Sequence, residues 1–267
     1  MYEEPYKWVE AVGNRRQYLD DQFKQGSPVV GVAYDHGILL MTVSKGTAKL
    51  YEIYDRLALG GMGHPADLEK LRFTLLETAH VEGFNRSPSD VTGSRMVKYG
   101  IAPILKQAFE EVFKAPFIVK LVLAELGQKA GKDSFLTVNY DGTFEEKSRY
   151  AVLAANPAIE REMVAYLEQQ AVASFDQALG VAVCTWAVGD RAQHLAQQES
   201  GGEEASNSDH QPIDRTSLFA YLRRALVGKT LECVVLDRNM HGASKYRAIG
   251  LDEIRRVLPQ DIIPSLM

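Results

Sequence analysis

Residues 29–72 read VVGVAYDHGILLMTVSKGTAKLYEIYDRLALGGMGHPADLEKLR, and this stretch decides the fold. Two apolar runs, 28–34 and 38–43, flank the turn Asp35-His36-Gly37, which is the pattern of a β-hairpin. A third apolar run, 57–63, ends in glycines and leads into an amphipathic helix. The stretch therefore predicts strands that are covered by a helix.

The same order of strands and helices returns along the rest of the chain. A second helix is expected to begin at an N-cap, Ser89 or Asp90, and to end at Pro116, which cannot continue it. The other expected strands are 117–126, 134–140, 150–155, 231–237 and 245–248, and the other expected helices are 157–171, 174–188, 218–227 and 251–258. Two blocks of strands, each followed by a helical pair, predict one α+β domain, a four-layer αββα sandwich with the helices outside.

The two ends of the chain and one internal segment differ from this pattern. Residues 5–25 predict an amphipathic helix that packs either on its own domain or on a neighbouring subunit. Residues 190–214 are polar and rich in Gly, Ser, Gln and Glu, which predicts a disordered insertion. The expected division is an N-terminal tail and helix (1–26), a single domain (27–258) and a C-terminal tail (259–267).

The composition excludes several classes of protein. The chain has 267 residues, of which 46% are hydrophobic and 24% charged, as in ordinary globular domains. Its net charge of −5 argues against nucleic-acid binding. We find neither an apolar run long enough for a membrane span nor a signal peptide, and Cys184 and Cys233 are too few for a disulfide scaffold. We therefore expect a cytoplasmic protein without nucleic-acid or membrane partners.

No residue pattern nominates a catalytic or cofactor site by itself. Gly228-Lys229-Thr230 is like the end of a phosphate-binding loop, but Arg223 stands where that loop needs glycine. The histidines show no metal-ligand spacing, so neither a metal nor another cofactor is expected. Lys45 and Lys49 flank a short turn, and they are either ordinary surface lysines or include one that receives a carboxylate.

Several stretches together resemble proteasome subunits. Residues 29–72 resemble their first strands and first helix, including the Lys-aliphatic-Tyr segment at 49–51. SDVTGSRMVKYGIAPIL, FIVKLVLAEL and LTVNYDGTFEE resemble the second helix and central strands of bacterial, actinobacterial-type alpha subunits, and LECVVLDRNMHGASKYRAI resembles their last strands. The resemblance covers residues 5–190 and 228–258, and it implies the αββα sandwich of N-terminal nucleophile hydrolases.

The resemblance also distinguishes the alpha type of subunit from the beta type. Beta subunits expose an N-terminal threonine whose amine, with a nearby Asp and Lys, activates the hydroxyl. Ser27 matches the nucleophile position here, but Val43 matches the aspartate position and cannot orient or charge-balance a lysine. Alpha subunits keep a helix ahead of the first strand, as residues 5–25 do. The resemblance therefore implies a non-catalytic alpha-type subunit.

An alpha subunit of this family forms seven-membered outer rings on rings of threonine-protease beta subunits, through which unfolded protein substrates pass. The resemblance implies that Lys49 pairs with the C-terminal carboxylate of a ring-shaped ATPase or other activator, and that Gly63 and His64 form the wall of that pocket. It places the gate of the axial pore in the residues before and around the first helix. Those residues are Met1, Tyr2, Glu3, Glu4, Pro5 and Tyr18.

Two other functions stay open at this stage. The first alternative is an N-terminal nucleophile hydrolase that cuts itself before Ser27. The second is a ring that serves as a scaffold without beta partners. The mass of the intact chain separates the first of these from the alpha-type interpretation, because self-processing removes residues 1–26.

Overall fold

The predicted hairpin lies at the centre of the first of two sheets. The computed structural model describes residues 4–111, 113–201, 215–259 and 262. The strands of the first sheet, in spatial order, are β10 (Tyr246–Ala248), β9 (Thr230–Asp237), β2 (Gly37–Ser44), β1 (Val29–Tyr34) and β8 (Tyr150–Leu153). Every residue of β2 is buried, because this strand is central in its sheet and covered on both faces.

The second sheet packs against the first and is also antiparallel. Its strands, in spatial order, are β3 (Leu50–Tyr54), β4 (Leu57–Gly63), β5 (Val119–Glu125), β6 (Ser134–Val138) and β7 (Phe144–Lys147). The strand β7 was not expected from the sequence. It is a short edge strand of sequence FEEK with no buried residue, so it lacks the apolar alternation that identifies a strand.

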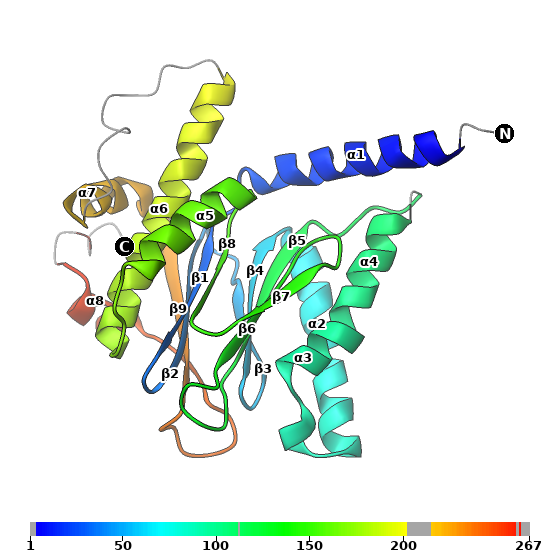
Figure 1. The fold of residues 1–267 in the computed structure, drawn as a ribbon. Helices are drawn as coiled ribbons and strands as arrows, with labels where there is room; N and C mark the ends of the chain where they lie inside the picture. The colour runs from blue at the N-terminus through cyan, green and yellow to red at the C-terminus, as the bar shows by residue number, and fades with distance from the viewer. Residues whose placement is uncertain (1–3, 112, 202–214, 260–261, 263–267) are drawn as a thin grey trace.

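Helices cover the outer faces of both sheets (Figure 1). The first sheet is covered by α5 (Pro157–Glu168) and α6 (Phe175–Gly201), with α7 (Arg215–Ala225) and α8 (Leu251–Val257) beside α6. The second sheet is covered by α2 (Pro65–Asn85), α3 (Gly93–Arg95) and α4 (Ala102–Glu110), with a 3-10 helix at Pro88–Asp90 and a π-helix at Met96–Ile101. The predicted four-layer α+β sandwich is thus confirmed. Among the described residues, no helix is both long and apolar enough to cross a membrane.

The second covering helix begins later than expected. Ser87 caps only the short 3-10 helix, and the side chain of Thr92 caps α3 by accepting from the Arg95 amide at 3.4 Å. The prediction of an N-cap at Ser89 or Asp90 is therefore wrong. The helix then passes through a π-helical stretch directly before Pro103, which has no amide hydrogen to donate to the preceding turn.

The prediction of a disordered insertion over residues 190–214 is wrong for its first part. Helix α6 continues to Gly201, and the side chains of Asp190, Arg191 and Gln193 are buried. Tertiary hydrogen bonds of these polar side chains offset the cost of ordering a segment with few apolar residues. Residues 202–214 lie outside the described residues.

The N-terminal helix α1 (Glu4–Phe23) lies across one end of the sandwich and reaches from the start of β1 toward α4 (Figure 1). Leu19 and Phe23 are fully buried, whereas Trp8 and Val9 near its other end are exposed. Arg15 donates from Nη1 to the carbonyls of Ala108 (3.1 Å) and Phe109 (2.7 Å) at the end of α4. The guanidinium thus caps the carboxyl end of α4, where the helix dipole favours a cation.

Candidate functional site

A cavity of about 420 Å³ lies at the end of the sandwich where β1 begins and β2 and β4 end. Four parts of the chain surround it: the link between α1 and β1, the segment from β2 to β3, the end of β4, and the last turns of α6 with the residue before β9. Its lining residues are Lys24, Gln25, Gly26, Ser27, Val43, Lys45, Thr47, Lys49, Gly63, Pro65, Asp190, Gln193, His194, Gln197 and Lys229. The volume is in the range of pockets that hold ligands.

Lys49 is the most desolvated cation of this cavity. Its ammonium donates to the carbonyl of Val43 at 3.3 Å, and its backbone amide donates to Glu232 Oε2 at 2.9 Å. Burial lowers the pKa of Lys49, and the positive charges of Lys229 and Lys45 lower it further, while Glu232 and Asp190 act in the opposite direction. A buried ammonium with free hydrogen-bonding capacity is a suitable partner for a carboxylate.

Gly63 lines the same cavity as Lys49, but it is the backbone geometry of the fold that requires glycine at this position. Its φ is +136°, and a Cβ atom there would lie 2.0 Å from the carbonyl oxygen of Ile118, the residue directly before the neighbouring strand β5. His64 caps α2 beside the cavity, its Nδ1 accepting from the Ala66 amide at 3.3 Å. The structure therefore brings Lys49 and Gly63 together and gives His64 a capping contact at the neighbouring position.

Ser27 lies in the same cavity, in the link between α1 and β1. Its hydroxyl accepts a hydrogen bond of 3.0 Å from the indole of Trp186 on α6. The amide group of Gln193, also on α6, donates at 2.6 Å to the carbonyls of both Lys24 and Gly26. The link is thus clamped to α6 on both sides of Gln25, and the Ser27 hydroxyl is engaged in packing the fold.

Among the described residues, the other predicted site residues, which belong to the expected gate, are not in the lining of this cavity. Tyr18 is half exposed on α1, and Glu4 and Pro5 form its first turn. Met1, Tyr2 and Glu3 lie outside the described residues. Among the described side chains, the expected gate residue Tyr18 therefore does not line the cavity that Lys49 and Gly63 share.

Sequence reasoning missed several residues that shape the cavity. Glu232 holds the main chain of Lys49, and its presence inside the otherwise apolar strand TLECVVLD was a signal that could have found it. Asp190, Gln193 and Lys229 had no such signal. They come within reach only because α6 and the start of β9 fold back on the link after α1.

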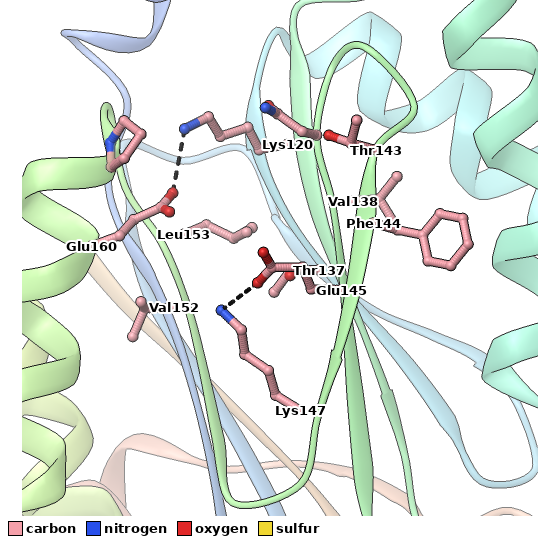
Figure 2. A pocket seen from close by; sticks show the side chains of 12 residues that line it. Lys120, Thr137, Val138, Thr143, Phe144, Glu145, Lys147, Val152, Leu153 and Glu160 are labelled. Atoms are coloured by element: carbon pink, nitrogen blue, oxygen red, sulfur yellow. Dashed lines mark hydrogen bonds and ion pairs between the residues drawn. The ribbon is translucent and has the colours of Figure 1, made fainter.

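A second cavity, of about 260 Å³, opens between the edge strands β7 and β8 (Figure 2). In Figure 2, Lys120 reaches Glu160 across it and Lys147 reaches Glu145, with nitrogen–oxygen distances of 3.3 Å in each pair. The buried ammonium of Lys120 also donates to the carbonyls of Ala154 (2.8 Å) and Ala155 (3.4 Å). Its donors are thus all engaged, and we assign Lys120 to holding β5 against the start of α5.

The described residues contain no cluster of three metal-ligating side chains. Cys184 and Cys233 are both buried and unpaired, and burial raises the pKa of each thiol, so both stay protonated at neutral pH. Among the described residues, the cavity of Lys49 thus offers ammonium groups to a ligand.

Comparisons with known proteins identify the family of the chain. A family described as proteasome subunit matches residues 23–183. A proteasome subunit alpha of Thermobifida fusca is 31% identical over 250 residues, which is 92% of this chain and 86% of the relative. One from Thermomonospora curvata is 28% identical over 228 residues, covering 85% of this chain and 84% of the relative. One from Saccharopolyspora erythraea is 34% identical over 131 residues, about half of each chain. The chain belongs to the proteasome subunit family.

Proposed function

We propose that this chain is a non-catalytic alpha-type subunit that forms a heptameric outer ring on a ring of threonine-protease beta subunits. The observation that carries the proposal is the environment of Ser27. A nucleophile of this fold needs a free amine and a neighbouring carboxylate. Ser27 instead follows α1 in the chain and accepts a hydrogen bond from Trp186, and Val43, which also lines the cavity, stands at the position that the resemblance assigns to the aspartate. The names of the compared relatives support the alpha type.

Packing also argues against self-processing before Ser27. Cleavage there would remove α1, whose Leu19 and Phe23 are fully buried, and would leave an apolar hole at the end of the sandwich. The hydrogen bonds of Gln193 to the link would be lost as well. Because the packing of the sandwich depends on α1, we expect the chain to keep this helix rather than to lose it by cleavage.

Replacing Ser27 by alanine tests this assignment. In a core particle assembled with beta subunits, peptide hydrolysis should stay the same, because Ser27 only accepts a hydrogen bond from Trp186. The loss of that bond should lower the free energy of unfolding by about 0.5–1.5 kcal/mol, measured by urea titration. Peptide hydrolysis by the isolated chain that disappears in Ser27→Ala would instead establish a self-sufficient hydrolase.

The proposed pocket for activators is the cavity of Lys49. We propose that Lys49 receives the C-terminal carboxylate of a ring-shaped ATPase or other activator, with Gly63 in the pocket wall. The partial burial of Lys49 strengthens a charge-assisted hydrogen bond, and its ammonium has only one partner, the Val43 carbonyl, among the described residues. His64 would fix the adjoining end of α2.

The proposed gate is the N-terminal tail. Deletion of residues 1–4 is expected to raise peptide hydrolysis by the assembled core particle severalfold in the absence of an activator, because the tail no longer obstructs the axial pore. Hydrolysis of a fluorogenic peptide before and after adding an activator measures this, and the activator should add little to the truncated particle. Equal basal rates of hydrolysis in the full-length and truncated particles would show that residues 1–4 do not form the gate.

A further inference from the structure

The cations around Lys49 outnumber what one terminal carboxylate neutralises. Lys45 and Lys229 line the same cavity, and His194 stands at its edge on α6. A third cavity, of about 370 Å³, shares His194 with the Lys49 cavity and lies between α6 and α7, and Arg224 lines it. None of Lys45, Lys49, Lys229 and Arg224 forms an ion pair with a carboxylate of the described residues.

The acidic groups that face these cations already have other partners. Asp190 accepts from the Tyr221 hydroxyl at 2.7 Å and lies 3.6 Å from His194. Glu232 accepts from the Lys49 backbone amide. Lys24 also lines the first cavity, but Asp21 neutralises it at 2.7 Å. Among the described residues, four cations without an ion pair therefore face two carboxylates, so at least one of these positive charges remains after a terminal carboxylate has bound.

The positions of these cations also show where the remaining positive charge lies relative to Lys49. Lys49 sits inside the first cavity, whereas Lys45 and Arg224 are exposed and His194 is exposed where the two cavities meet. A peptide whose carboxylate reaches Lys49 thus passes the other cations with the residues that precede its C-terminus. Unpaired cations along such a path favour an acidic side chain over a neutral one.

We propose that the activator tail that fits this chain carries an acidic side chain within a few residues of its C-terminal carboxylate. The inference rests on the proposed docking function of the Lys49 cavity. The terminal carboxylate binds Lys49, and the acidic side chain pairs with Lys229 or Lys45 in the first cavity or with Arg224 across His194. Such a tail should bind more tightly than a tail of the same length whose only negative charge is its terminal carboxylate.

The test uses fluorescein-labelled octapeptides of Gly and Ser that end in Leu, titrated into the assembled ring and followed by fluorescence anisotropy. Each peptide carries Asp or Asn at one of the four positions before Leu, and each is made with a free or an amidated C-terminus. At the best position we expect the Asp peptide to bind about fivefold more tightly than its Asn counterpart at low salt. Amidation should weaken both.

Protein variants locate the second charge. Among Lys45→Ala, Lys229→Ala and Arg224→Ala, the variant that removes the partner of the acidic side chain should lower the ratio of Asp to Asn affinity toward one, while the ratio of free to amidated affinity stays; an unchanged Asp to Asn ratio in all three would overturn the proposal. Lys129→Ala is the matched control, since Lys129 is an exposed lysine beyond the opposite end of β5 and should change neither ratio.

The outcomes separate this inference from the function on which it rests. Equal binding of Asp and Asn peptides, with a preserved effect of amidation, would overturn the proposal that the site recognises an acidic side chain. It would leave the pocket for the terminal carboxylate in place. Equal binding of free and amidated peptides would overturn the proposed docking at Lys49. Absence of binding by every peptide would overturn both.

Discussion

Replacement of Lys49 by alanine is expected to abolish the stimulation of proteolysis by an activator while ring assembly stays intact. Charge-assisted hydrogen bonds contribute about 1.5–3 kcal/mol, so each tail should bind roughly ten- to hundredfold more weakly. Because several tails engage one ring, the loss accumulates. The measurements are fluorogenic peptide hydrolysis with and without activator, and the mass of the ring by light scattering.

Lys49→Arg is the matched control because it keeps the positive charge. In the natural chain, tail binding needs the ammonium form, and burial lowers the pKa of Lys49, so binding should decline with rising pH before an ordinary lysine would titrate. The arginine variant should keep part of the affinity and lose this pH dependence, since arginine stays charged. Unchanged stimulation in Lys49→Ala would refute the pocket.

The same variant should not be less stable than the natural chain. Since the depressed pKa means that burial disfavours the charged form, removing the ammonium relieves a cost of folding at neutral pH. Thermal unfolding at equal protein concentration should therefore give a midpoint that is unchanged or higher, which separates a loss of binding from a loss of structure.

Replacement of Phe23 by alanine is expected to have the largest effect on stability, about 3–5 kcal/mol. Phe23 is fully buried, and its ring stacks on that of Tyr140 with 5.9 Å between centroids. The Lys120 ammonium lies 5.4 Å from the same ring. The variant loses the apolar contact that seats α1 on the sandwich, so urea titration should show a lower midpoint and hydrogen exchange should become faster along α1.

Phe84→Ala on α2 is the matched control for this prediction. It removes the same side chain from a position that is 91% exposed, and such surface changes stay within about 0.5 kcal/mol. Comparable destabilisation by both variants would contradict the role of Phe23 as the anchor of α1.

Local patterns were enough to predict most of the fold. The hairpin of β1 and β2 was predicted from two apolar runs around a tight turn, and the structure pairs Tyr34 with Gly37 across that turn. Helix α1 was predicted from apolar spacing and begins and ends within two residues of the expectation. These elements depend on contacts between residues close in sequence, which a single sequence displays.

Errors occurred where distant contacts override local preference. No local pattern indicates that Arg15 caps α4, because its carbonyl partners on α4 lie 93 and 94 residues away in the chain. The last turns of α6 were predicted to be disordered from their polar composition, yet Gln193 binds carbonyls 167 and 169 residues earlier in the chain. Polar side chains reveal nothing of such partners until the chain is folded.

The sequence by itself determined the two-sheet sandwich, the helix ahead of the first strand and the choice of Lys49 as the cation of interest. Periodicity and turn chemistry encode the first two, and a family resemblance supplied the third. Only the tertiary structure decided that Lys45, Lys49 and Lys229 share one cavity under α6, and that Trp186 engages Ser27. The physical reason is that electrostatic and hydrogen-bonding partners act through distance in space, and here 159 residues of chain separate the hydroxyl of Ser27 from the indole that binds it.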